Sequence, residues 1–269
     1  LGSTGILTVF ELRKFGEEFL LRFPPTAHPE RLCDFEDIPQ LFSILSESKK
    51  WGKMIGVSSV GQLNELVEQR RVKDFVEITE TLQNKKIAEI ADRISERKTV
   101  KVVLIAGPSS SGKTTTSKKL SMQLRVLGYE PLMISLDDYY RGKDNTPLDE
   151  DGNPDFECLE ALDVPLLNEK LVELFDGKSV ELPSFDFKTN ARRYSGKKTT
   201  LNERSILILE GIHGLNDRLT PRVPQDFKFK IYLSALTQLN LDDHNRIPTS
   251  DNRLVRRIVR DAQFRGKGA

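Results

Sequence analysis

The chain has 269 residues, with 41 lysines and arginines against 40 aspartates and glutamates and a formal net charge of +1. This length allows one large domain or two ordinary ones, each able to bury a hydrophobic core. The balanced charge excludes the global positive field that is typical of nucleic-acid and membrane-surface binding proteins, so an anion site has to be local. One local excess occurs in residues 251–269, which hold six basic residues and two aspartates.

Cysteine and histidine usage argues against disulfides and structural metals. The two cysteines, Cys33 and Cys158, are too few and too far apart for a disulfide framework, and neither has metal-ligand spacing with a histidine. We expect a reducing, cytoplasmic environment, because no uncharged apolar stretch approaches the roughly 18 residues of a membrane span and the first residues lack a secretory-signal pattern. Because the chain starts at Leu1 and stops after a glycine-rich end, we also expect it to be part of a longer protein.

The hydrophobic pattern changes near residue 98. Before it, residues 10–23 fit helical spacing but contain Gly16 and precede two prolines, so this stretch is left unassigned. Ser59 has the position of an N-cap for a short helix over residues 62–69. A second amphipathic helix is indicated by apolar residues at helical spacing, namely Ile87, Ile90, Ala91 and Ile94.

Beyond residue 98, short apolar runs alternate with helical patterns, which is typical of an α/β domain. The runs are residues 102–106, 132–136, 206–209 and 229–233. Because the runs are uninterrupted, we expect strands buried on both faces of a parallel sheet. Helices are predicted over residues 115–127 and 164–175, each stopped by a glycine. The predicted architecture is a parallel sheet flanked by helices, preceded by a smaller α+β domain.

A glycine-rich loop joins the first apolar run to the first of these helices. Residues 107–114 match G-x-x-x-x-G-K-[ST], the Walker A pattern, in the strand–loop–helix context that it requires. Such a loop turns successive backbone N–H groups and the positive helix end toward one place, which predicts a triphosphate site. We expect Lys113 to bridge the β- and γ-phosphates and the Thr114 hydroxyl to bind Mg²⁺. The predicted nucleotide-binding set in this loop is Gly107, Ser109, Ser110, Ser111, Gly112, Lys113, Thr114 and Thr115.

Other motifs separate the classes of P-loop protein. The Asn-Lys-x-Asp tetrapeptide expected of a GTPase is absent, which disfavours that class. A motor-type ATPase usually ends its third strand in Asp-Glu, whereas residues 206–209 are followed by the single acid Glu210. A small-molecule kinase tolerates this arrangement. We expect Glu210 to orient metal-bound water; the alternative is a satisfied carboxylate at a strand end.

A pair of acids follows the second predicted strand, at Asp137 and Asp138. Ligands of open parallel sheets bind beyond the carboxyl ends of strands, so Asp137 is expected beside the P-loop. There it can accept the proton of an incoming hydroxyl or help to hold Mg²⁺. The alternative is that one of the two acids caps a turn while the next residues, Tyr139 and Tyr140, pack in the core.

A basic helix is predicted near the end of the chain, with Asp251 as its N-cap. Its arginines recur at i, i+3, i+4 and i+7, at Arg253, Arg256, Arg257 and Arg260. The opposite face is apolar, so we expect it to pack on the body while the arginines face a triphosphate. A solvated basic face is the alternative, and a nucleic-acid stripe is disfavoured because few aromatics are interleaved.

Two aromatic residues flank an acid between the second and third predicted strands, at Phe185 and Phe187. The aromatic rings can stack on a base, and the acid between them can form hydrogen bonds with a sugar. Their alternation also fits an ordinary half-buried strand, and from the residues alone this second interpretation is favoured.

With the Walker A loop, Ser-Leu-Asp-Asp-Tyr-Tyr, Phe-Asp-Phe, Ile-Leu-Glu-Gly and the arginine helix in this order, residues 99–269 resemble the uridine kinase and phosphoribulokinase family of P-loop kinases. The resemblance implies ATP and Mg²⁺ as cofactors, Asp137 as the base for a sugar 5′-hydroxyl, and Glu210 in Walker B. It also implies that the arginine helix is a lid over ATP. The residues given catalytic roles are Asp137, Lys113, Arg253 and Arg256, with Arg257 and Arg260 binding ATP.

The resemblance further implies an acceptor pocket that departs from the nucleoside-kinase pattern. Glu157 stands where those kinases have an aspartate that contacts ribose, Phe185 replaces a tyrosine, and Asn190 replaces a base-contacting histidine. We therefore expect a nucleoside-like acceptor, but these departures do not support specificity for pyrimidines. The predicted acceptor-binding set is Asp137, Tyr139, Tyr140, Glu157, Phe185, Asn190 and Arg192. The family's segment after the lid is missing from this chain, which leaves its own activity open.

Residues 1–98 resemble the end of the second additional domain of threonyl-tRNA synthetase, most clearly around residues 87–94, without that domain's metal-binding His and Cys pattern. We expect no chemistry from this segment and a structural or partner-positioning role.

The predicted function is transfer of the γ-phosphoryl group of Mg·ATP to a sugar hydroxyl of a nucleoside-like small molecule. One alternative is an ATP-binding regulatory module without turnover. The other is a kinase for a sugar phosphate or a pantothenate-like alcohol, with Lys188, Arg192 and Arg193 holding an extra phosphate. Neither a membrane nor a nucleic acid is expected as a partner, and an oligomer is left open.

Overall fold

The computed structural model describes residues 8–16, 18–142, 145–186, 189–237, 239–242 and 245–264. The chain forms two units, Leu1–Trp51 and Gly52–Ala269. Within the described residues, no helix is both long enough and apolar enough to cross a membrane.

The first unit contains an antiparallel hairpin of β1 (Glu11–Phe15) and β2 (Glu18–Arg22), and most of helix α1 (Pro39–Ile55). Residues 10–23, unassigned from sequence, therefore include a β-hairpin. Its turn contains Gly16 with a φ of 60°, a left-handed conformation that glycine adopts without a Cβ clash. On one side the ring of Phe15 packs 4.2 Å from that of Phe42. Large apolar residues on or beside the two strands are exposed, namely Phe10, Leu12, Phe19, Leu21 and Phe23.

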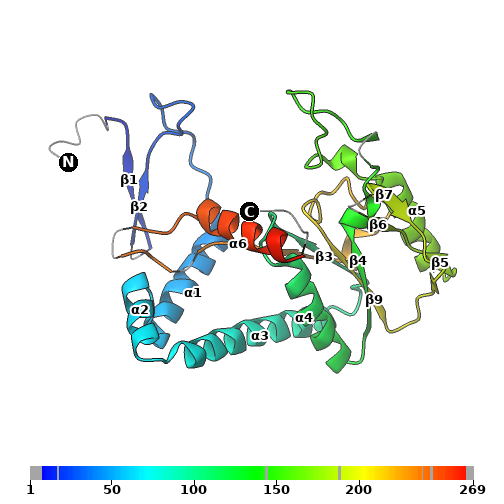
Figure 1. Ribbon diagram of the computed structural model, residues 1–269, viewed down its shortest axis with the longest axis horizontal. Helices are drawn as coiled ribbons and strands as arrows, with labels where there is room; N and C mark the ends of the chain where they lie inside the picture. Colours follow the sequence, from blue (N-terminus) through cyan, green and yellow to red (C-terminus); the bar gives the residue numbers. More distant parts are fainter. Residues whose placement is uncertain are drawn as a thin grey trace. The chain divides into compact units, whose positions relative to one another are not determined.

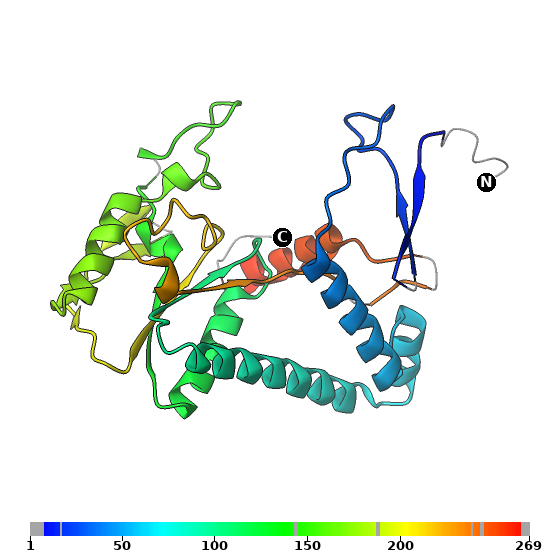
Figure 2. The same ribbon diagram turned by 180° about the vertical axis from the view of Figure 1, so that it is seen from behind.

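The second unit begins with two helices, α2 (Val60–Glu68) and α3 (Val72–Glu96). Ser59 caps α2 as predicted, and its hydroxyl and the Gln62 side chain form a reciprocal capping box. The predicted apolar face of α3 buries Ile87, Ala91 and Ile94 against α4 (Lys113–Val126) and the central sheet (Figure 2). The border between the units thus precedes the pattern change at residue 98, and the assignment of residues 1–98 to a synthetase-like domain stays a prediction.

The centre of the second unit is a parallel four-stranded sheet in the order β10-β3-β9-β4 (Figure 1). The strands are β3 (Val102–Ala106), β4 (Glu130–Ser135), β9 (Ser205–Glu210) and β10 (Lys228–Tyr232). Each corresponds to one of the four predicted apolar runs, which confirms the expected α/β fold. The central strands β3 and β9 are buried on both faces as expected. The outer strands β4 and β10 are partly exposed, because each pairs with a neighbour on one side only in this sheet. The parallel strands end at one edge, where β3 continues into the P-loop and β9 ends in Glu210.

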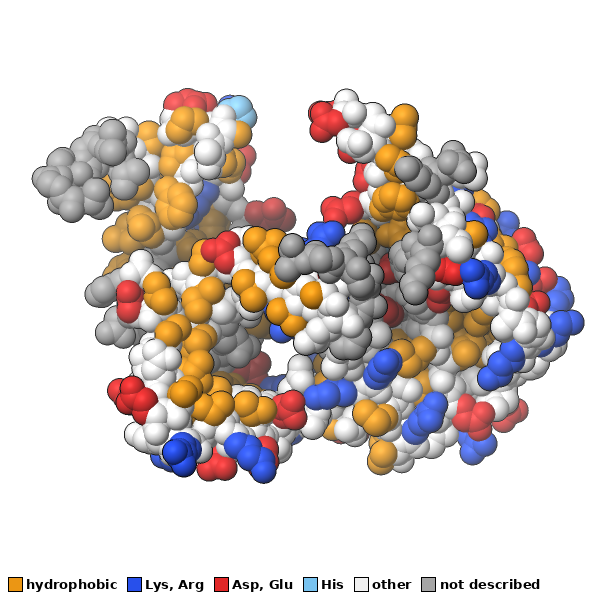
Figure 3. Space-filling model, viewed as in Figure 1, with side chains coloured by type: hydrophobic (Ala, Val, Ile, Leu, Met, Phe, Trp, Pro, Cys, Tyr) orange, Lys and Arg blue, Asp and Glu red, His pale blue; other side chains and the backbone are white. Residues whose placement is uncertain are grey.

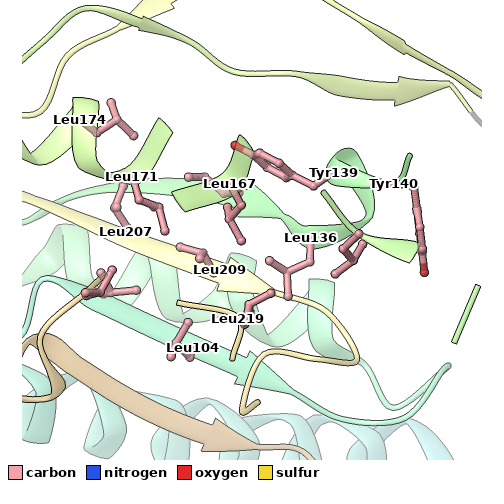
Figure 4. Close-up of a cluster of buried hydrophobic side chains, with 14 of the residues drawn as sticks. Leu104, Leu136, Tyr139, Tyr140, Leu167, Leu171, Leu174, Leu207, Leu209 and Leu219 are labelled. Atoms are coloured by element: carbon pink, nitrogen blue, oxygen red, sulfur yellow. The ribbon is translucent and has the colours of Figure 1, made fainter. Parts of the chain in front are cut away.

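Side chains of alternate strand residues enter two separate cores, one on each face of the sheet. Leu104 and Leu209 face a core that includes Leu167 and Leu171 of α5 (Val164–Phe175) (Figure 4). The intervening strand residues face the core shared with α3 and α4, where Ile105 packs with other buried residues. Helices cover both faces, so the sheet edge at the carboxyl ends of the strands is the part left to form a site.

Short elements complete this unit around the sheet. The 3₁₀ turns are η1 (Leu136–Tyr139), η3 (Leu159–Ala161) and η4 (Gln225–Phe227). The short strands are β5 (Val180–Glu181), β6 (Ser184–Asp186), β7 (Ala191–Arg193) and β8 (Lys198–Thr199), and they pair as β5–β8 and β6–β7. Phe185 therefore lies in a strand, as the favoured interpretation held, whereas Phe187 and Lys188 fall outside the described residues.

The arginine helix is α6 (Thr249–Phe264), and two expectations about it were wrong. Asp251 lies in its first turn and is not its N-cap. The apolar face does not pack on the body: Leu254, Val255, Ile258 and Val259 are 44% to 60% exposed (Figure 3). The physical reason is that arginines of the other face hydrogen-bond to the P-loop, which turns the apolar face toward solvent.

Candidate active site

The loop between β3 and α4 has a backbone that only small residues tolerate. A Cβ atom on Gly107 would lie 2.5 Å from the carbonyl oxygen of Leu233, which no side chain permits. Gly112 has a φ of 94°, and Ser110 adopts a positive φ of 60° that is unusual for a residue with a side chain. The loop curls in the manner expected of a phosphate cradle.

The hydroxyls of this loop fit a bound anion. Within the described part of the chain, the Oγ atoms of Ser110 and Ser111 are buried and have no hydrogen-bond partner. Buried polar atoms normally have a partner, so two orphaned hydroxyls in one loop indicate groups that are satisfied by a ligand. The oxygens of a nucleotide phosphate fit these donors, as they fit the N-terminal N–H groups of α4.

Lys113 folds back onto the same loop. Its Nζ donates hydrogen bonds to the carbonyl oxygens of Gly107 at 2.9 Å and Pro108 at 3.1 Å. Burial lowers the pKa of Lys113, while the charges of Glu210 and Asp137 raise it. A partly desolvated ammonium held by two neutral carbonyls would gain from exchanging them for a phosphate.

Glu210 joins the loop from the end of β9. Thr114 Oγ1 donates to Glu210 Oε1 at 2.8 Å, so the two predicted metal-binding residues lie side by side. Burial raises the pKa of Glu210, and the nearby Asp137 carboxylate raises it further, against the hydrogen bond from Thr114 and the charge of Lys113. Mg²⁺ prefers one or two protein oxygens together with phosphate oxygens, and this pair fits that donor set. No cluster of three metal-ligating side chains occurs among the described residues.

The two acids after β4 have different surroundings. Asp137 lies two residues after Ser135, the register partner of Glu210, so it stands at the same edge of the sheet as the loop. Its charge raises the pKa values of both Lys113 and Glu210. Asp138 is turned to β6, where its Oδ1 accepts a hydrogen bond from the Phe185 N–H at 3.0 Å. Burial raises the pKa of Asp138. The turn η1 therefore directs one carboxylate to the nucleotide loop and the other to the neighbouring hairpin.

The adjacent tyrosines pack in the core, as the alternative interpretation had it (Figure 4). Tyr139 is 1% exposed, and burial raises the pKa of its phenol. Tyr140 donates its hydroxyl to the Phe156 carbonyl at 3.0 Å, and its ring meets those of Phe156 and Phe185 edge-on. A contact between either tyrosine and an acceptor stays a prediction.

A cavity of about 490 Å³ lies beside this turn. It is lined by Arg141, Gly142, Asn145, Asp163, Asn190, Ala191 and Arg192. Two predicted acceptor residues, Asn190 and Arg192, are thus brought together. Glu157 lies in an exposed loop that precedes η3, where its N–H donates to Asp155. Asp163 was missed, although an aspartate before a helix with proline in its first turn is an N-cap signal, and it does cap α5.

The arginines of α6 divide into two pairs. Arg253 and Arg256 donate through Nε to the P-loop carbonyls of Ser109 and Ser110, each at 3.1 Å. The other pair, Arg257 and Arg260, makes contacts with Asp261 on the same helix. The first pair therefore bonds to the nucleotide loop directly, while the charges of both Arg260 and Arg253 lower the pKa of Lys113. Thr115 lies exposed in the first turn of α4.

Comparison with known proteins identifies the family of the chain. A profile of the phosphoribulokinase/uridine kinase family matches residues 102–269. The chain belongs to this family. The uridine kinase of Ligilactobacillus salivarius is 33% identical over 166 residues, which cover 62% of this chain and 68% of that protein. The uridine kinase of Bacillus subtilis is 30% identical over 166 residues, covering 62% of this chain and 69% of its own length.

A solved structure described as a possible uridine kinase from Bacillus stearothermophilus is 22% identical, with a TM-score of 0.41; it is matched over 65% of this chain and 91% of its own. Membership of the family supports ATP-dependent kinase activity on a small-molecule substrate, and it implies ATP and typically Mg²⁺ as cofactors.

Proposed function

We propose that the chain transfers the γ-phosphoryl group of Mg·ATP to a sugar hydroxyl of a nucleoside-like small molecule. The observation that carries this proposal is the hydrogen bond from Thr114 of the P-loop helix to Glu210, which stands opposite Ser135 in the sheet, just before Asp137. Lys113, Glu210 and Asp137 therefore come from elements that end at one edge of the sheet, and each charge affects the pKa of Lys113 or Glu210. A cation for phosphate, a carboxylate for metal and a second carboxylate for the acceptor are the parts that phosphoryl transfer to an alcohol needs.

The nucleotide is held by the loop. Backbone N–H groups at the start of α4 and the buried hydroxyls of Ser110 and Ser111 donate to phosphate oxygens. Lys113 exchanges its bonds to Gly107 and Pro108 for the β- and γ-phosphates. Bound between Thr114 and Glu210, Mg²⁺ would neutralise charge on the phosphates.

The acceptor is activated by Asp137. Its carboxylate takes the proton from the acceptor hydroxyl as that oxygen forms the new bond to the γ-phosphorus, while the bond from phosphorus to the leaving oxygen of ADP breaks. Arg253 and Arg256 already contact the loop, and they stabilise negative charge on the transferred group.

Two ion pairs support an acceptor without a phosphate of its own. Arg192 is paired with Asp163 at 2.9 Å, and Arg193 is paired with Asp186 at 2.5 Å. The two arginines that the sugar-phosphate alternative uses are therefore each paired with a carboxylate of the fold. This arrangement favours a nucleoside-like alcohol over the sugar-phosphate alternative.

The test is a product assay with labelled ATP, Mg²⁺ and a panel of acceptors that includes nucleosides, phosphorylated sugars and pantothenate-like alcohols. We expect label to be transferred to at least one nucleoside. Transfer to a sugar phosphate or pantothenate-like alcohol alone would overturn the proposed acceptor class. Slow hydrolysis without transfer to any acceptor would support the regulatory alternative instead.

A further inference from the structure

We propose that Arg192 is a positioning residue: its guanidinium holds the turn that carries Asp137, so that the β6–β7 hairpin couples the acceptor cavity to the proposed base. This inference rests on the proposed function, because that function makes Asp137 the base.

Arg192 reaches three acceptors outside its own hairpin. Its Nε donates to the carbonyl of Tyr140 at 2.9 Å, and its Nη2 donates to the carbonyl of Tyr139 at 3.3 Å. Its Nη1 forms an ion pair with Oδ2 of Asp163 at 2.9 Å. The side chains of Arg192 and Asp163 are 21% and 26% exposed, so these contacts are partly shielded from water. A planar fork with all three nitrogens engaged fixes orientation as well as charge.

Asp163, the ion-pair partner of Arg192, is itself held in place by hydrogen bonds. Asp163 caps α5 by accepting a hydrogen bond from the Leu166 N–H at 3.2 Å. Its own N–H donates to the carbonyl of Tyr139 at 2.8 Å, so Asp163 and Arg192 share that oxygen. Helix α5 is in turn held by buried residues such as Leu167 and Leu171 (Figure 4). The end of η1 is therefore tied to a rigid helix through a side chain of the hairpin.

The neighbouring strand holds the other side of the same turn. Phe185 of β6 is the register partner of Arg192 on β7. The N–H of Phe185 donates to the carboxylate of Asp138 at 3.0 Å, while Arg192 binds the backbone carbonyls that follow. The two paired residues thus bind the turn at two points: Phe185 bonds to the Asp138 side chain, and Arg192 bonds to the backbone carbonyls. Asp137 precedes these contact points within the same short turn, and its position depends on both.

The hairpin also lines the cavity beside the turn, which we take as the acceptor cavity because its lining includes two residues of the predicted acceptor-binding set. Asn190, in the β6–β7 turn with a φ of 51°, and Arg192 both face this cavity of about 490 Å³. An acceptor that orders the hairpin would consequently order the turn that carries the base. Arg192 makes none of its described contacts with the P-loop, so its loss should spare nucleotide binding.

The adjacent residue offers a matched control. Arg193 lies on the same strand, pairs with Asp186 and is 61% exposed. Arg193→Gln removes one arginine from β7 without touching the turn. Arg192→Gln removes the fork, and Arg192→Lys keeps the charge but provides a single donor centre for three acceptors.

The experiment measures steady-state kinetics and amide hydrogen exchange of the full chain carrying each substitution. We expect Arg192→Gln to lower kcat by roughly 10- to 100-fold, since small misplacements of a reacting group have effects of this size. Arg192→Lys should fall between Arg192→Gln and the unaltered protein, the KM for ATP should change less than about twofold, and Arg193→Gln should match the unaltered protein. Exchange of the Tyr140 and Arg141 amides, which are bonded to Asp137 and Ala161, should accelerate in Arg192→Gln alone.

An unchanged kcat, or a parallel rise in the KM for ATP, would overturn the proposal. If Arg192→Gln fails to fold, Asp163→Asn removes the anchor charge and is expected to lower kcat in the same way. Combining Asp163→Asn with Arg192→Lys should then cause less than the product of the two single losses. If the unaltered protein phosphorylates no acceptor, the proposed function fails, and hydrogen exchange still decides whether Arg192 holds the turn.

Discussion

Thr114 and Glu210 are joined by a hydrogen bond of 2.8 Å, although they are 96 residues apart in sequence. The bond links the first turn of the P-loop helix to the end of β9. It holds the two oxygen groups proposed for Mg²⁺ together, because the register of β3 and β9 sets Ile105 opposite Glu210. The proposed metal site therefore depends on strand pairing more than on the local loop.

Replacing Glu210 by glutamine should separate stability from activity. Burial raises the pKa of Glu210 in the folded protein above its ordinary value of 4.5. Protonated Glu210 therefore stabilises the fold fully at pH values below 4.5, and this stabilisation is lost as pH rises through the pKa of the folded protein. At neutral pH the ionised group is a net cost to the unliganded protein. We expect Glu210→Gln to raise Tm at pH 7, while a magnesium titration of kinase activity requires more Mg²⁺ and reaches a lower maximum. An unchanged magnesium dependence would remove Glu210 from the metal site.

Replacing Asp137 by asparagine tests the proposed base. Asparagine cannot take the acceptor proton, so turnover should fall by roughly 10²- to 10⁴-fold while ATP binding stays close to that of the unaltered protein. Asp138→Asn is the matched control: its amide oxygen can still accept the Phe185 N–H, and burial already raises the pKa of Asp138 toward the neutral form. Rapid kinetics on both variants would contradict the assignment if they lost turnover equally.

Replacing a glycine by alanine should have opposite effects on stability in the P-loop and in helix α2. In Gly107→Ala the new methyl would meet the Leu233 carbonyl at 2.5 Å, and we expect about 1–3 kcal/mol of destabilisation. Gly61→Ala in α2 meets nothing nearer than 3.8 Å and should stabilise by about 0.5–1 kcal/mol. Urea unfolding of the two variants measures the change in the free energy of unfolding and its sign in each. Equal stabilities would mean that the close approach of the loop to Leu233 is not present in solution.

The arginines of α6 should differ in importance. Arg256 bonds to the P-loop carbonyl of Ser110, whereas Arg257 lies 3.7 Å from Asp261 on its own helix and is 57% exposed. We therefore expect Arg256→Gln to lower kcat by roughly 10- to 100-fold and Arg257→Gln to leave it within about twofold. Steady-state kinetics with saturating ATP distinguish them. The reverse ranking would show that a different face of α6 meets the nucleotide.

The parts of the fold that follow from local pattern were predictable. The four strands of the sheet each contain an apolar run, and the N-cap at Ser59 follows from a serine at the start of a helical pattern. The hairpin in residues 10–23 was not assigned, because its apolar residues fit helical spacing whereas Gly16 and the two prolines indicate a shorter element. Pairing with a second strand, which a single segment does not display, decides such a case.

The candidate site divides in the same way. The Walker A loop, Asp137 and Glu210 stand at strand ends, where topology alone brings them together. The contacts of Arg192 with Tyr139 and Tyr140 join residues more than 50 positions apart, and no spacing rule predicts them. The exposed apolar face of α6 likewise depends on tertiary contacts. Because the arginine face bonds to the P-loop carbonyls, the apolar face is left exposed, and the sequence of the helix alone does not show this.

The most direct measurement is calorimetry of nucleotide binding to the unaltered chain and to Lys113→Ala, with and without Mg²⁺. Lys113 is the cation at the centre of the loop, and its two carbonyl contacts are ready to be exchanged for phosphate. We expect magnesium-dependent binding of ATP by the unaltered chain and a loss of affinity of at least about tenfold in the variant. Absence of binding by the folded chain, or equal binding by the variant, would contradict it.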